Sequence, residues 1–599
     1  MQVSGGQYII NYLEKENVPY MLGIPGHGVL GLFDALRQSD KDGKVRYLQV
    51  KHEQAAVHIA DGYFRMSGKP LATISSIGPG SLNTIIGMAT AYVDSSAVLS
   101  FCGDVHTNMK GTGVLQEIER YQDSNFLKTM EPVTKRAWRV ENVNQLPRIM
   151  ARAFGQMRGG RNGPIAVAVP MDVQSESFEA ELPAAPAVDA AAHSSIDEQT
   201  IAEAVAIMRS AKRPVILAGG GALKARAAEE LTALAERWGA AVVTTLAGKS
   251  AFPERHPLYC FHTGSKGTPV GLEICRQADV ILALGVRFAD ETTCSYKAGA
   301  AFSFPKTRLI HVDMQAEEIG KNYAADLGIV ADLKTVARQL FDAYPVTEER
   351  PEYKAEIAER KQRWAQQLAE RRAADTEFCT ISQLLGEMNA GLPGETIIAT
   401  SSGNTQAQLL QEYCFEQPYT CLTTGGFSTM GWAMPAAAGA KLACPDTPVV
   451  ALMGDGDFMM TMQELATLVQ YDIPVVVVVA NNSGWLAIKD LQHDAYGEEY
   501  MFGNDWLKDG GVYSPDFAQA AASFGMRSKK IHRREEVAAA LQEALACGHP
   551  YLLEVDVCRD YPHTGGESFG WWDVPVPAYI TERHEVYRQG KSHEFERGY

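Results

Sequence analysis

Two hydrophobic runs in the C-terminal half, each ending in polar residues suited to a metal ion, constrain this chain most. The first run, 449–453, leads into Gly454-Asp455-Gly456-Asp457, and the second, 474–480, leads into Asn481-Asn482. Asp455 and Asn482 are 27 residues apart, which leaves room for one crossover helix between two parallel, adjacent strands. Both side chains would then lie at the strand ends where α/β sheets bind ligands.

Asp455 and Asn482 offer only oxygen atoms to a metal, which favours a hard cation. Mg²⁺ takes few protein ligands and keeps coordination positions for phosphate oxygens. Gly456 lets the backbone approach a diphosphate closely because it has no side chain. A Gly-Asp-Gly sequence alone is common in loops, so the expectation of a magnesium–diphosphate site depends on the two flanking strands as well.

The composition argues against several other classes of protein. Apolar residues make up 46% and charged residues 21% of the chain, a balance typical of globular proteins. The formal net charge is −17, and we find no basic run with interleaved aromatic residues, so no nucleic-acid partner is expected. The ten cysteines include no Cys-x-x-Cys pair, which argues against a disulfide framework or a zinc site.

No membrane association is expected either. The longest strongly apolar stretch, around 473–480, is far shorter than the roughly 20 residues that a membrane helix needs. The first residues contain no basic region followed by an apolar one, so no secretory signal is expected. We therefore predict a soluble, cytoplasmic protein.

Two shifts in composition divide the chain into three α/β blocks and a tail. An Ala/Pro-rich stretch at 182–189 follows the first block, and a stretch dense in Glu, Lys, Arg and Ala at 345–375 follows the second. Strands alternate with helices throughout, which predicts parallel sheets covered by helices on both faces. The predicted fold class is α/β, with three doubly wound parallel-sheet domains at 1–175, 190–345 and 376–560 and a C-terminal arm at 561–599.

The Gly-Asp-Gly and Asn-Asn pattern resembles the diphosphate motif of thiamine-diphosphate (ThDP) enzymes. Such enzymes also need a carboxylate paired with ring atom N1′ of the cofactor's aminopyrimidine. It drives the ring to the tautomer that takes the proton from C2, most effectively in a dry pocket. Glu53, just after the predicted strand 47–50, is our candidate for this acid. The alternative interpretation of Glu53 is a residue that caps the following helix.

Nearly all of the chain up to about residue 560 resembles the acetolactate-synthase-like branch of the ThDP enzymes. The segments that carry this resemblance are 23–26, 52–54, 61–63, 78–83, 103–105, 116–117, 219–221, 248–249, 252–254, 256–258, 311–313 and 430–431, together with the motif above. The resemblance implies that the first block binds the pyrimidine and the third the diphosphate. It also implies a homodimer or homotetramer in which each pocket takes Glu53 from one subunit and Asp455 from another.

Further roles follow from the resemblance, residue by residue. The metal ligands would be Asp455, Asn482 and the carbonyl of Gly484, and Met430 would hold the cofactor in its bent form. Gln116 matches a glutamine that points into the reaction pocket. His27 lies on the loop facing the thiazolium, where an imidazole could move protons near neutral pH. The other expected cofactor contacts are Ser402, Gly403, Asn404, Gly456 and Asp457.

Two of these assignments have plain alternatives. Without the resemblance, Met430 would be interpreted as an ordinary core residue. His27 would be interpreted as a hydrogen-bonded loop histidine.

The middle block is expected to bind a nucleotide. In acetolactate synthases and pyruvate oxidases this domain binds FAD, and in oxalyl-CoA decarboxylase it binds ADP. Gly220 and Gly221 follow one predicted strand and Arg287 follows another, so these residues could contact phosphate. Asp313 and Asp332 could hold ribose or adenine. FAD is the expected ligand, and another nucleotide or an empty domain remain the alternatives, because glycine-rich turns also occur for packing alone.

Three positions depart from biosynthetic acetolactate synthase. Leu491 aligns with the Trp that selects the acceptor, Thr405 with a His of the diphosphate loop, and Leu115 with a Phe before the pocket glutamine. A strict role in branched-chain amino-acid synthesis is therefore not expected. The Leu491 pocket could admit a larger acceptor, unless Trp485 refills it.

Four segments resemble a second ThDP enzyme, the trihydroxycyclohexanedione hydrolase of inositol breakdown. They are 26–28, 75–80, 114–119 and the aromatic tail 570–576. The tail would cover a subunit or the site entrance, or serve only as a surface-packing arm.

The sequence thus predicts a 2-oxo-acid decarboxylase/carboligase of acetolactate-synthase type that uses ThDP and Mg²⁺, with FAD in the middle domain. Its substrates would be a pyruvate-type donor and a carbonyl acceptor. The alternatives are a ThDP-dependent hydrolase of cyclic 1,2-diketones and, from another class, a non-catalytic nucleotide-binding subunit.

Overall fold

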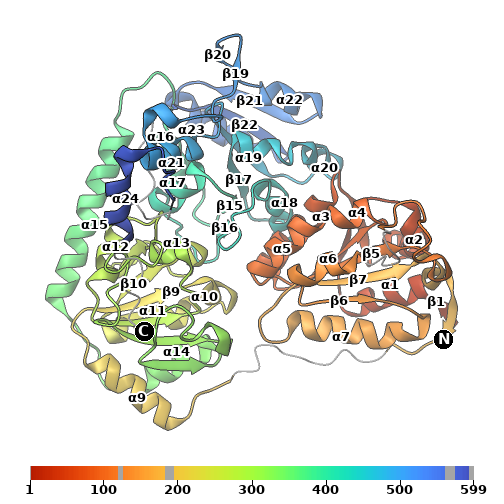
Figure 1. Cartoon of the computed structure of the whole chain (residues 1–599), viewed down its shortest axis with the longest axis horizontal. Coiled ribbons are helices and arrows are strands. Elements are labelled where there is room, and N and C mark those ends of the chain that lie inside the picture. Colours follow the sequence, from red (N-terminus) through yellow and green to blue (C-terminus); the bar gives the residue numbers. More distant parts are fainter. Residues whose placement is uncertain (1, 119–125, 183–193, 560–573, 593–599) are drawn as a thin grey trace.

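The computed structural model describes residues 2–118, 126–182, 194–559 and 574–592. These residues contain three six-stranded parallel sheets, each flanked by helices (Figure 1). The predicted α/β fold class with three doubly wound sheets is confirmed. Most of the Ala/Pro-rich linker, Glu119 and the aromatic residues Trp571 and Trp572 lie outside the described residues. Within the described part of the chain, no helix combines the length and apolarity needed to cross a bilayer.

The first sheet has the strand order β3-β2-β4-β5-β7-β6. Its strands are β2 (Tyr20–Gly23), β3 (Arg46–Gln49), β4 (Leu71–Ser75), β5 (Val98–Asp104), β6 (Arg136–Arg139) and β7 (Ile165–Pro170). Strands β4, β5 and β7 are buried at every position, as expected for a parallel sheet covered on both faces. The chain moves to one side of β2 for β3 and to the other side for β4, so the sheet's switch point lies between β2 and β4.

The middle sheet follows the same plan, with the order β11-β10-β9-β12-β13-β14. Its strands are β9 (Pro214–Ala218), β10 (Ala241–Thr244), β11 (Tyr259–His262), β12 (Val280–Leu284), β13 (Arg308–Asp313) and β14 (Leu327–Val330). Its switch point lies between β9 and β12.

The third sheet has the order β16-β15-β17-β18-β22-β21. Its strands are β15 (Ile397–Thr400), β16 (Cys421–Thr423), β17 (Val449–Gly454), β18 (Val476–Asn481), β21 (Arg527–Ile531) and β22 (Tyr551–Asp556). Strands β17 and β18 are the two hydrophobic runs from which the sequence argument began. They pair in parallel with Met453 beside Val479, as predicted.

A long helix joins the middle sheet to the third, α15 (Pro351–Arg372), which runs along one side of the molecule in Figure 1. Only Tyr353, Ile357 and Trp364 of this helix are buried. The charged stretch at 345–375 is therefore a largely solvated connecting helix, as its composition predicts.

The first and third sheets meet through two helices in close contact, α3 (Glu53–Ser67) and α18 (Ala433–Ala443), which lie side by side in Figure 1. A Cβ atom on Gly62 would lie 2.2 Å from the carbonyl oxygen of Ala436, and one on Gly439 would lie 2.0 Å from that of Ile59. Both positions therefore require glycine. The two sheets share one hydrophobic core around these helices.

Burial of His58 on α3 predicts a loss of stability in mild acid. The side chain is 0% exposed, and this burial lowers the pKa of His58 from 6.5 to about 4. Because the folded state disfavours the charged ring, its contribution is complete above pH 6.5 and is lost as the pH falls towards 4. At about pH 5 the loss amounts to about 2 kcal/mol. We expect His58→Gln, which can still accept from Gln54, to show a smaller fall in Tm between about pH 7.5 and 5 than the wild type.

The matched control for this measurement is His549→Gln. The His549 side chain is 53% exposed and pairs with Asp472 at the surface, so its replacement should leave the fall in Tm unchanged. Equal falls in the wild type and His58→Gln would contradict the role given to His58.

Candidate active site

The switch point of the third sheet gathers two of the expected cofactor-binding segments. Ser402, Gly403 and Asn404 follow β15, and Asp455 and its neighbours follow β17, the strand paired with β15. Gly403 has a φ of +88°, and α17 (Asn404–Glu412) begins directly after it. Ligands of doubly wound sheets bind outside the carboxyl ends of the strands at this point, and the start of α17 favours an anionic group.

Asp455 links the end of β17 to the turn after β18. Its Oδ1 accepts from the Gly456 N–H at 2.6 Å, and its Oδ2 accepts from the N–H groups of Asn482 and Gly484 at 3.0 and 3.3 Å. The residue is 3% exposed, and burial raises the pKa of Asp455 to about 6. The charged carboxylate is thus held in a place that disfavours it, and a bound cation would relieve this cost.

The two asparagines of the turn have different surroundings. Asn481 donates to Glu554 at 2.8 Å and to Ser514 at 2.9 Å, which fixes it within the sheet. The Oδ1 atom of Asn482 is buried and has no hydrogen-bond partner among the described residues. A buried acceptor without a partner is costly, so this atom is available for a ligand. Asp455, Asn482 and the Gly484 backbone lie together, and their oxygens fit Mg²⁺.

Met430 and Asp457 lie on neighbouring segments at the same switch point. The Gly431 N–H donates to Oδ1 of Asp457 at 2.5 Å, and Thr461 donates to the Gly431 carbonyl at 2.9 Å. Burial raises the pKa of Asp457 to about 7, and its Oδ2 has no partner in the described ranges. These bonds fix the turn that follows Met430, a half-buried residue.

His27 and Gln116 are brought near one another at the switch point of the first sheet. His27 follows β2, and the next residue, Gly28, donates through its N–H to Ser76 Oγ after β4, at 3.3 Å. Gln116 has a φ of +72°, and a Cβ on Gly78 would lie 2.1 Å from its carbonyl oxygen. Both His27 and Gln116 are exposed, as expected of residues at the edge of a site.

Glu53 is the first residue of α3 and is only 9% exposed. The capping residue of this helix is His52, whose ring accepts from the Gln54 N–H, so helix capping does not account for Glu53. Asn83 donates to Oε2 of Glu53 at 3.0 Å, and a Cβ on Gly80 would lie 3.0 Å from its Oε1. The carboxylate therefore packs closely against the turn after β4 and accepts a hydrogen bond from it.

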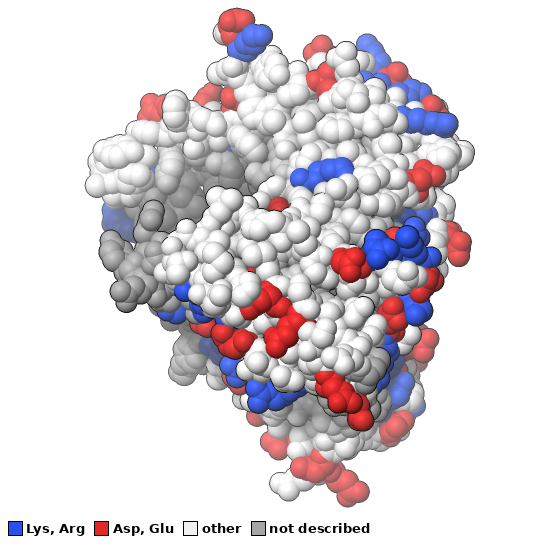
Figure 2. Space-filling view, turned by 90° about the vertical axis from the view of Figure 1, so that its right-hand side faces the viewer, with Lys and Arg blue, Asp and Glu red and all other residues white. Residues whose placement is uncertain are grey.

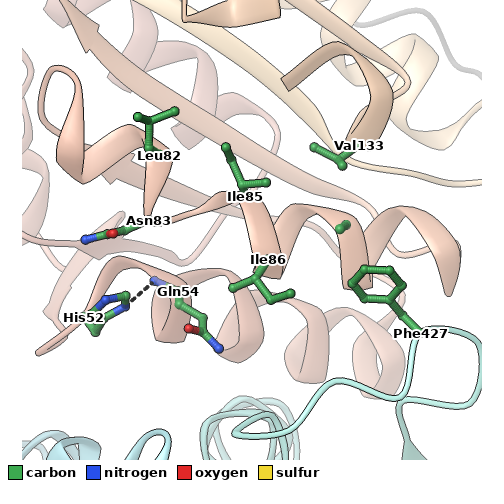
Figure 3. A pocket seen from close by; sticks show the side chains of 9 residues that line it. His52, Gln54, Leu82, Asn83, Ile85, Ile86, Val133 and Phe427 are labelled. Carbon is green, nitrogen blue, oxygen red and sulfur yellow. Dashed lines mark hydrogen bonds between the residues drawn. The ribbon is translucent and has the colours of Figure 1, made fainter. Parts of the chain in front are cut away.

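A cavity of about 440 Å³ is lined by His52 and Gln54, the two chain neighbours of Glu53 (Figure 3). Figure 3 shows His52, Gln54 and Asn83 on one side and Phe427 entering from the segment after β16. The other lining residues are Leu82, Ile85, Ile86, Ala89 and Val133. Its apolar wall would strengthen electrostatic interactions of a group bound next to Glu53.

Within one chain, the hydrogen bonds of the segment before Glu53 lead to the crossover between β17 and β18 and not to Asp455. The strand before Glu53 leads into Gln49 and Lys51, which bond Tyr471 at 2.6 Å and Gln470 at 2.6 Å. Tyr471 and Gln470 precede β18, whereas Asp455 lies beyond the carboxyl end of β17. Among the described residues, no hydrogen bond or ion pair joins Glu53 to Asp455.

The residues of the middle block expected to contact a nucleotide differ in how far protein contacts already occupy them. A Cβ on Gly221 would lie 2.7 Å from the Gly285 Cα, so the contact between two turns already requires this glycine, whereas Gly220 has more room. Arg287 donates to the Val93 carbonyl at 2.6 Å and to Ser95 Oγ at 2.9 Å, linking the middle sheet to the first. These turns lie at the sheet's switch point, which is where a nucleotide would fit.

The two aspartates expected near the ribose or adenine differ as well. Asp313 ends β13, and burial raises the pKa of its carboxyl. Asp332 caps α14 (Leu333–Ala343) by accepting from the Thr335 N–H at 2.8 Å. Both carboxylates already accept a backbone N–H, because that of Asp313 accepts from Gln315 at 2.9 Å, but Asp313 lies at the expected edge of the sheet.

Two residues of the acceptor region, Asp490 and Trp485, make contacts that the sequence did not predict. Asp490, on α21 (Leu486–Tyr496), accepts from Asn404 Nδ2 at 2.8 Å, next to Leu491. A Cβ on Gly456 would lie 2.2 Å from the ring of Trp485. Trp485 thus packs against Gly456. Glycine is required at this position by that contact, and close approach of a diphosphate would require it as well.

Comparisons with known proteins assign each part of the chain to one enzyme family. Three family models match: the N-terminal TPP binding domain, the central domain and the C-terminal TPP binding domain of thiamine pyrophosphate enzymes. They match residues 3–124, 201–340 and 401–555 respectively.

Three curated relatives are similar over almost the whole chain. A probable acetolactate synthase large subunit of Methanocaldococcus jannaschii is 34% identical, covering 92% of each chain. The acetolactate synthase isozyme 1 large subunit of Escherichia coli is 33% identical, covering 92% of this chain and 94% of the relative. The acetolactate synthase large subunit of Corynebacterium glutamicum is 33% identical over 93% of this chain and 87% of the relative.

Proposed function

This chain belongs to the thiamine pyrophosphate enzymes, in the acetolactate synthase branch, and from that premise we propose that it decarboxylates a pyruvate-type 2-oxo acid and joins the remaining fragment to a second carbonyl compound. The observation that carries the proposal is that Asp455 accepts the backbone N–H of Asn482 while the buried side-chain oxygen of Asn482 has no partner among the described residues. This is where a metal-held diphosphate would be needed.

Bound ThDP supplies the electron sink that allows a C–C bond next to a carbonyl to break. Asp455, Asn482 and the Gly484 carbonyl would hold Mg²⁺, which would supply positive charge for a diphosphate at this turn. The diphosphate would contact Ser402, Gly403, Asn404 and Gly456. Asp457 would fix the turn after Met430 by accepting from the Gly431 N–H. Met430 would then support the bent form of the cofactor.

Glu53 would hold the proton shared with N1′ of the aminopyrimidine. Its burial keeps water away, and the hydrogen bond from Asn83 at 3.0 Å sets its orientation. His27, exposed on its loop, would move a proton at the substrate oxygen or at water. Gln116 would orient the substrate carbonyl from the adjoining loop.

A complete site would take Glu53 and Asp455 from two different chains. The described residues of one chain show no hydrogen bond or ion pair between the two, and a homodimer is the smallest assembly that would supply them from different chains. Figure 2 shows a face with a broad central area carrying few charged side chains, which suits a subunit contact. We propose a homodimer, or a tetramer built from two of them, as the active form.

Co-assembly of two inactive variants should restore activity if the site is shared. In a mixed dimer of Glu53→Gln and Asp455→Ala chains, one pocket carries both changes and the other carries neither. Random mixing therefore predicts about one quarter of the wild-type activity, from about half of the dimers with one good pocket each. The measurement is turnover of pyruvate after co-expression. Activity no higher than that of either variant alone would contradict a shared site.

FAD is our proposed ligand of the middle domain. Gly220, Arg287 and Asp313 lie at the carboxyl edge of the sheet near its switch point, which supports a nucleotide there. The test is the absorbance spectrum of the purified protein, in which a bound flavin shows two visible and near-ultraviolet bands. ADP released on denaturation, with no flavin bands, would show that the domain binds ADP instead of FAD. Detection of neither compound would indicate a domain without a bound nucleotide.

The reaction itself is tested by product analysis. Acetolactate or acetoin from pyruvate supports the carboligase, whereas a ring-opened acid from a cyclic 1,2-diketone supports hydrolysis as the second candidate. The second candidate is favoured by the contact between the His27 loop and Ser76, two segments in which this chain resembles the dione hydrolase. Similarity to named synthases along almost the whole chain argues against a non-catalytic subunit.

A further inference from the structure

An arginine that follows the third sheet holds the backbone of the metal-site turn. Arg559 lies three residues beyond the end of β22. Its Nη1 donates to the carbonyl oxygen of Asn482 at 2.6 Å and to that of Ser483 at 3.1 Å. These two carbonyls directly precede that of Gly484, the third expected metal ligand. The guanidinium thus contacts two backbone oxygens of the turn that are not among its expected metal ligands.

A second segment, 504–506, is attached to the same turn. The Trp485 N–H donates to the Asn504 carbonyl at 2.8 Å, and the Trp506 N–H donates to the Ser483 carbonyl at 3.3 Å. Asp505 stands opposite Gly484 in an antiparallel bridge. The turn is therefore one strand of a short two-stranded contact.

Asp505 connects this segment to the arginine. Its carboxylate pairs with Nη2 of Arg559 and accepts from Lys489 Nζ at 3.2 and 3.1 Å. A positive charge near the turn would by itself weaken the binding of a cation. Asp505, shared between Arg559 and Lys489, offsets part of this positive charge and so reduces the electrostatic cost to the metal.

The conformation of the turn needs such support. Ser483 has a φ of +58°, a left-handed conformation that residues other than glycine rarely adopt and that persists only when the surroundings impose it. Arginine suits this task because its planar group donates to several acceptors at once and stays charged. A lysine at this position could contact only part of the same set.

We propose that Arg559, with Asp505, is a positioning residue of the metal site: it fixes the Asn482–Gly484 turn so that the Asn482 side chain and the Gly484 carbonyl face Asp455. The inference rests on the proposed function, because the turn is assigned to Mg²⁺ and ThDP. It concerns affinity for the metal–cofactor pair and not the chemical step.

The test is a Mg²⁺ titration of the full-length apoprotein at saturating ThDP. The signal is tryptophan fluorescence, since Trp485 and Trp506 lie at the turn with ring centroids 6.0 Å apart. We expect Arg559→Ala to raise the Mg²⁺ concentration for half-saturation by about tenfold or more, as removal of residues that orient metal ligands does. Arg559→Lys should give a smaller rise because it keeps the charge.

Arg527→Ala is the matched control, because Arg527 is an exposed arginine at the start of β21 in the same sheet. Its Mg²⁺ dependence should equal that of the wild type. An unchanged Mg²⁺ dependence in a folded Arg559→Ala protein would overturn the inference, with folding checked by the Tm of the apoprotein. If that variant does not fold, an unchanged Mg²⁺ dependence in Arg559→Lys overturns it instead.

The outcome separates this inference from the proposed function. Failure of the wild type to bind ThDP with Mg²⁺ would overturn the proposed function and this inference together. Wild-type binding with unaffected Arg559 variants would overturn this inference alone.

Discussion

Replacing Glu53 with glutamine is expected to slow the exchange of the C2 proton of bound ThDP by about a hundredfold or more. The amide cannot hold the proton that the carboxylate shares with N1′, so the aminopyrimidine is no longer driven to its reactive tautomer. Asn83 can still donate to the remaining side-chain oxygen, as it does to Glu53 Oε2. The fold and cofactor binding should therefore survive. The measurement is deuterium exchange at C2, quenched by acid and followed by NMR.

Glu141→Gln is the matched control for this experiment. Glu141 pairs with Arg139 in the same block, and its side chain is 56% exposed, so exchange should proceed at the wild-type rate. Near-normal exchange in a folded, cofactor-loaded Glu53→Gln protein would rule out the role assigned to Glu53.

Removal of the Asp455 side chain should abolish retention of ThDP and Mg²⁺. The substitution Asp455→Ala deletes the only charged metal ligand of the set, and it leaves the N–H groups of Gly456, Asn482 and Gly484 without their acceptor. A loss of about 3 to 5 kcal/mol is typical when one partner of a buried charge pair is removed, which lowers affinity by about two to four orders of magnitude. Equilibrium dialysis against ThDP with Mg²⁺ measures this.

Two further variants make this result specific. Asp455→Asn keeps one oxygen for the backbone N–H groups but not the charge, so we expect its affinity to lie between those of the wild type and the alanine variant. Asp446→Ala, at an exposed aspartate of the same block, should bind ThDP normally. Unchanged ThDP affinity in Asp455→Ala would remove the basis for a metal site at this turn.

The fold class could be predicted because the decisive patterns are local. The runs that became β17 and β18 are continuous stretches of apolar, largely β-branched residues, and their spacing left room for one crossover helix between parallel strands. The charged composition of 345–375 likewise predicts a solvated helix, which α15 is. Patterns of this kind depend on neighbours in the sequence, so they can be read without the tertiary structure.

Contacts between distant segments could not be predicted in the same way. Nothing in the sequence around Arg559 indicates that its guanidinium meets the carbonyls of Asn482 and Ser483. The capping of α3 by His52 instead of Glu53 also depends on the actual path of the chain. For Arg287, the expected phosphate contact competes with bonds to Val93 and Ser95 that only the assembled sheets create.

The backbone contact between α3 and α18 has a consequence for pairs of pockets. Gly62 and Gly439 bring the two helices so close that one cannot slide without the other. In the proposed dimer, α3 would carry Glu53 into one pocket, while α18 follows closely on the Met430 segment, which would line the second. A ligand that shifts either helix is therefore expected to change both pockets. Cofactor binding to a dimer would then be cooperative without a hinge motion between domains.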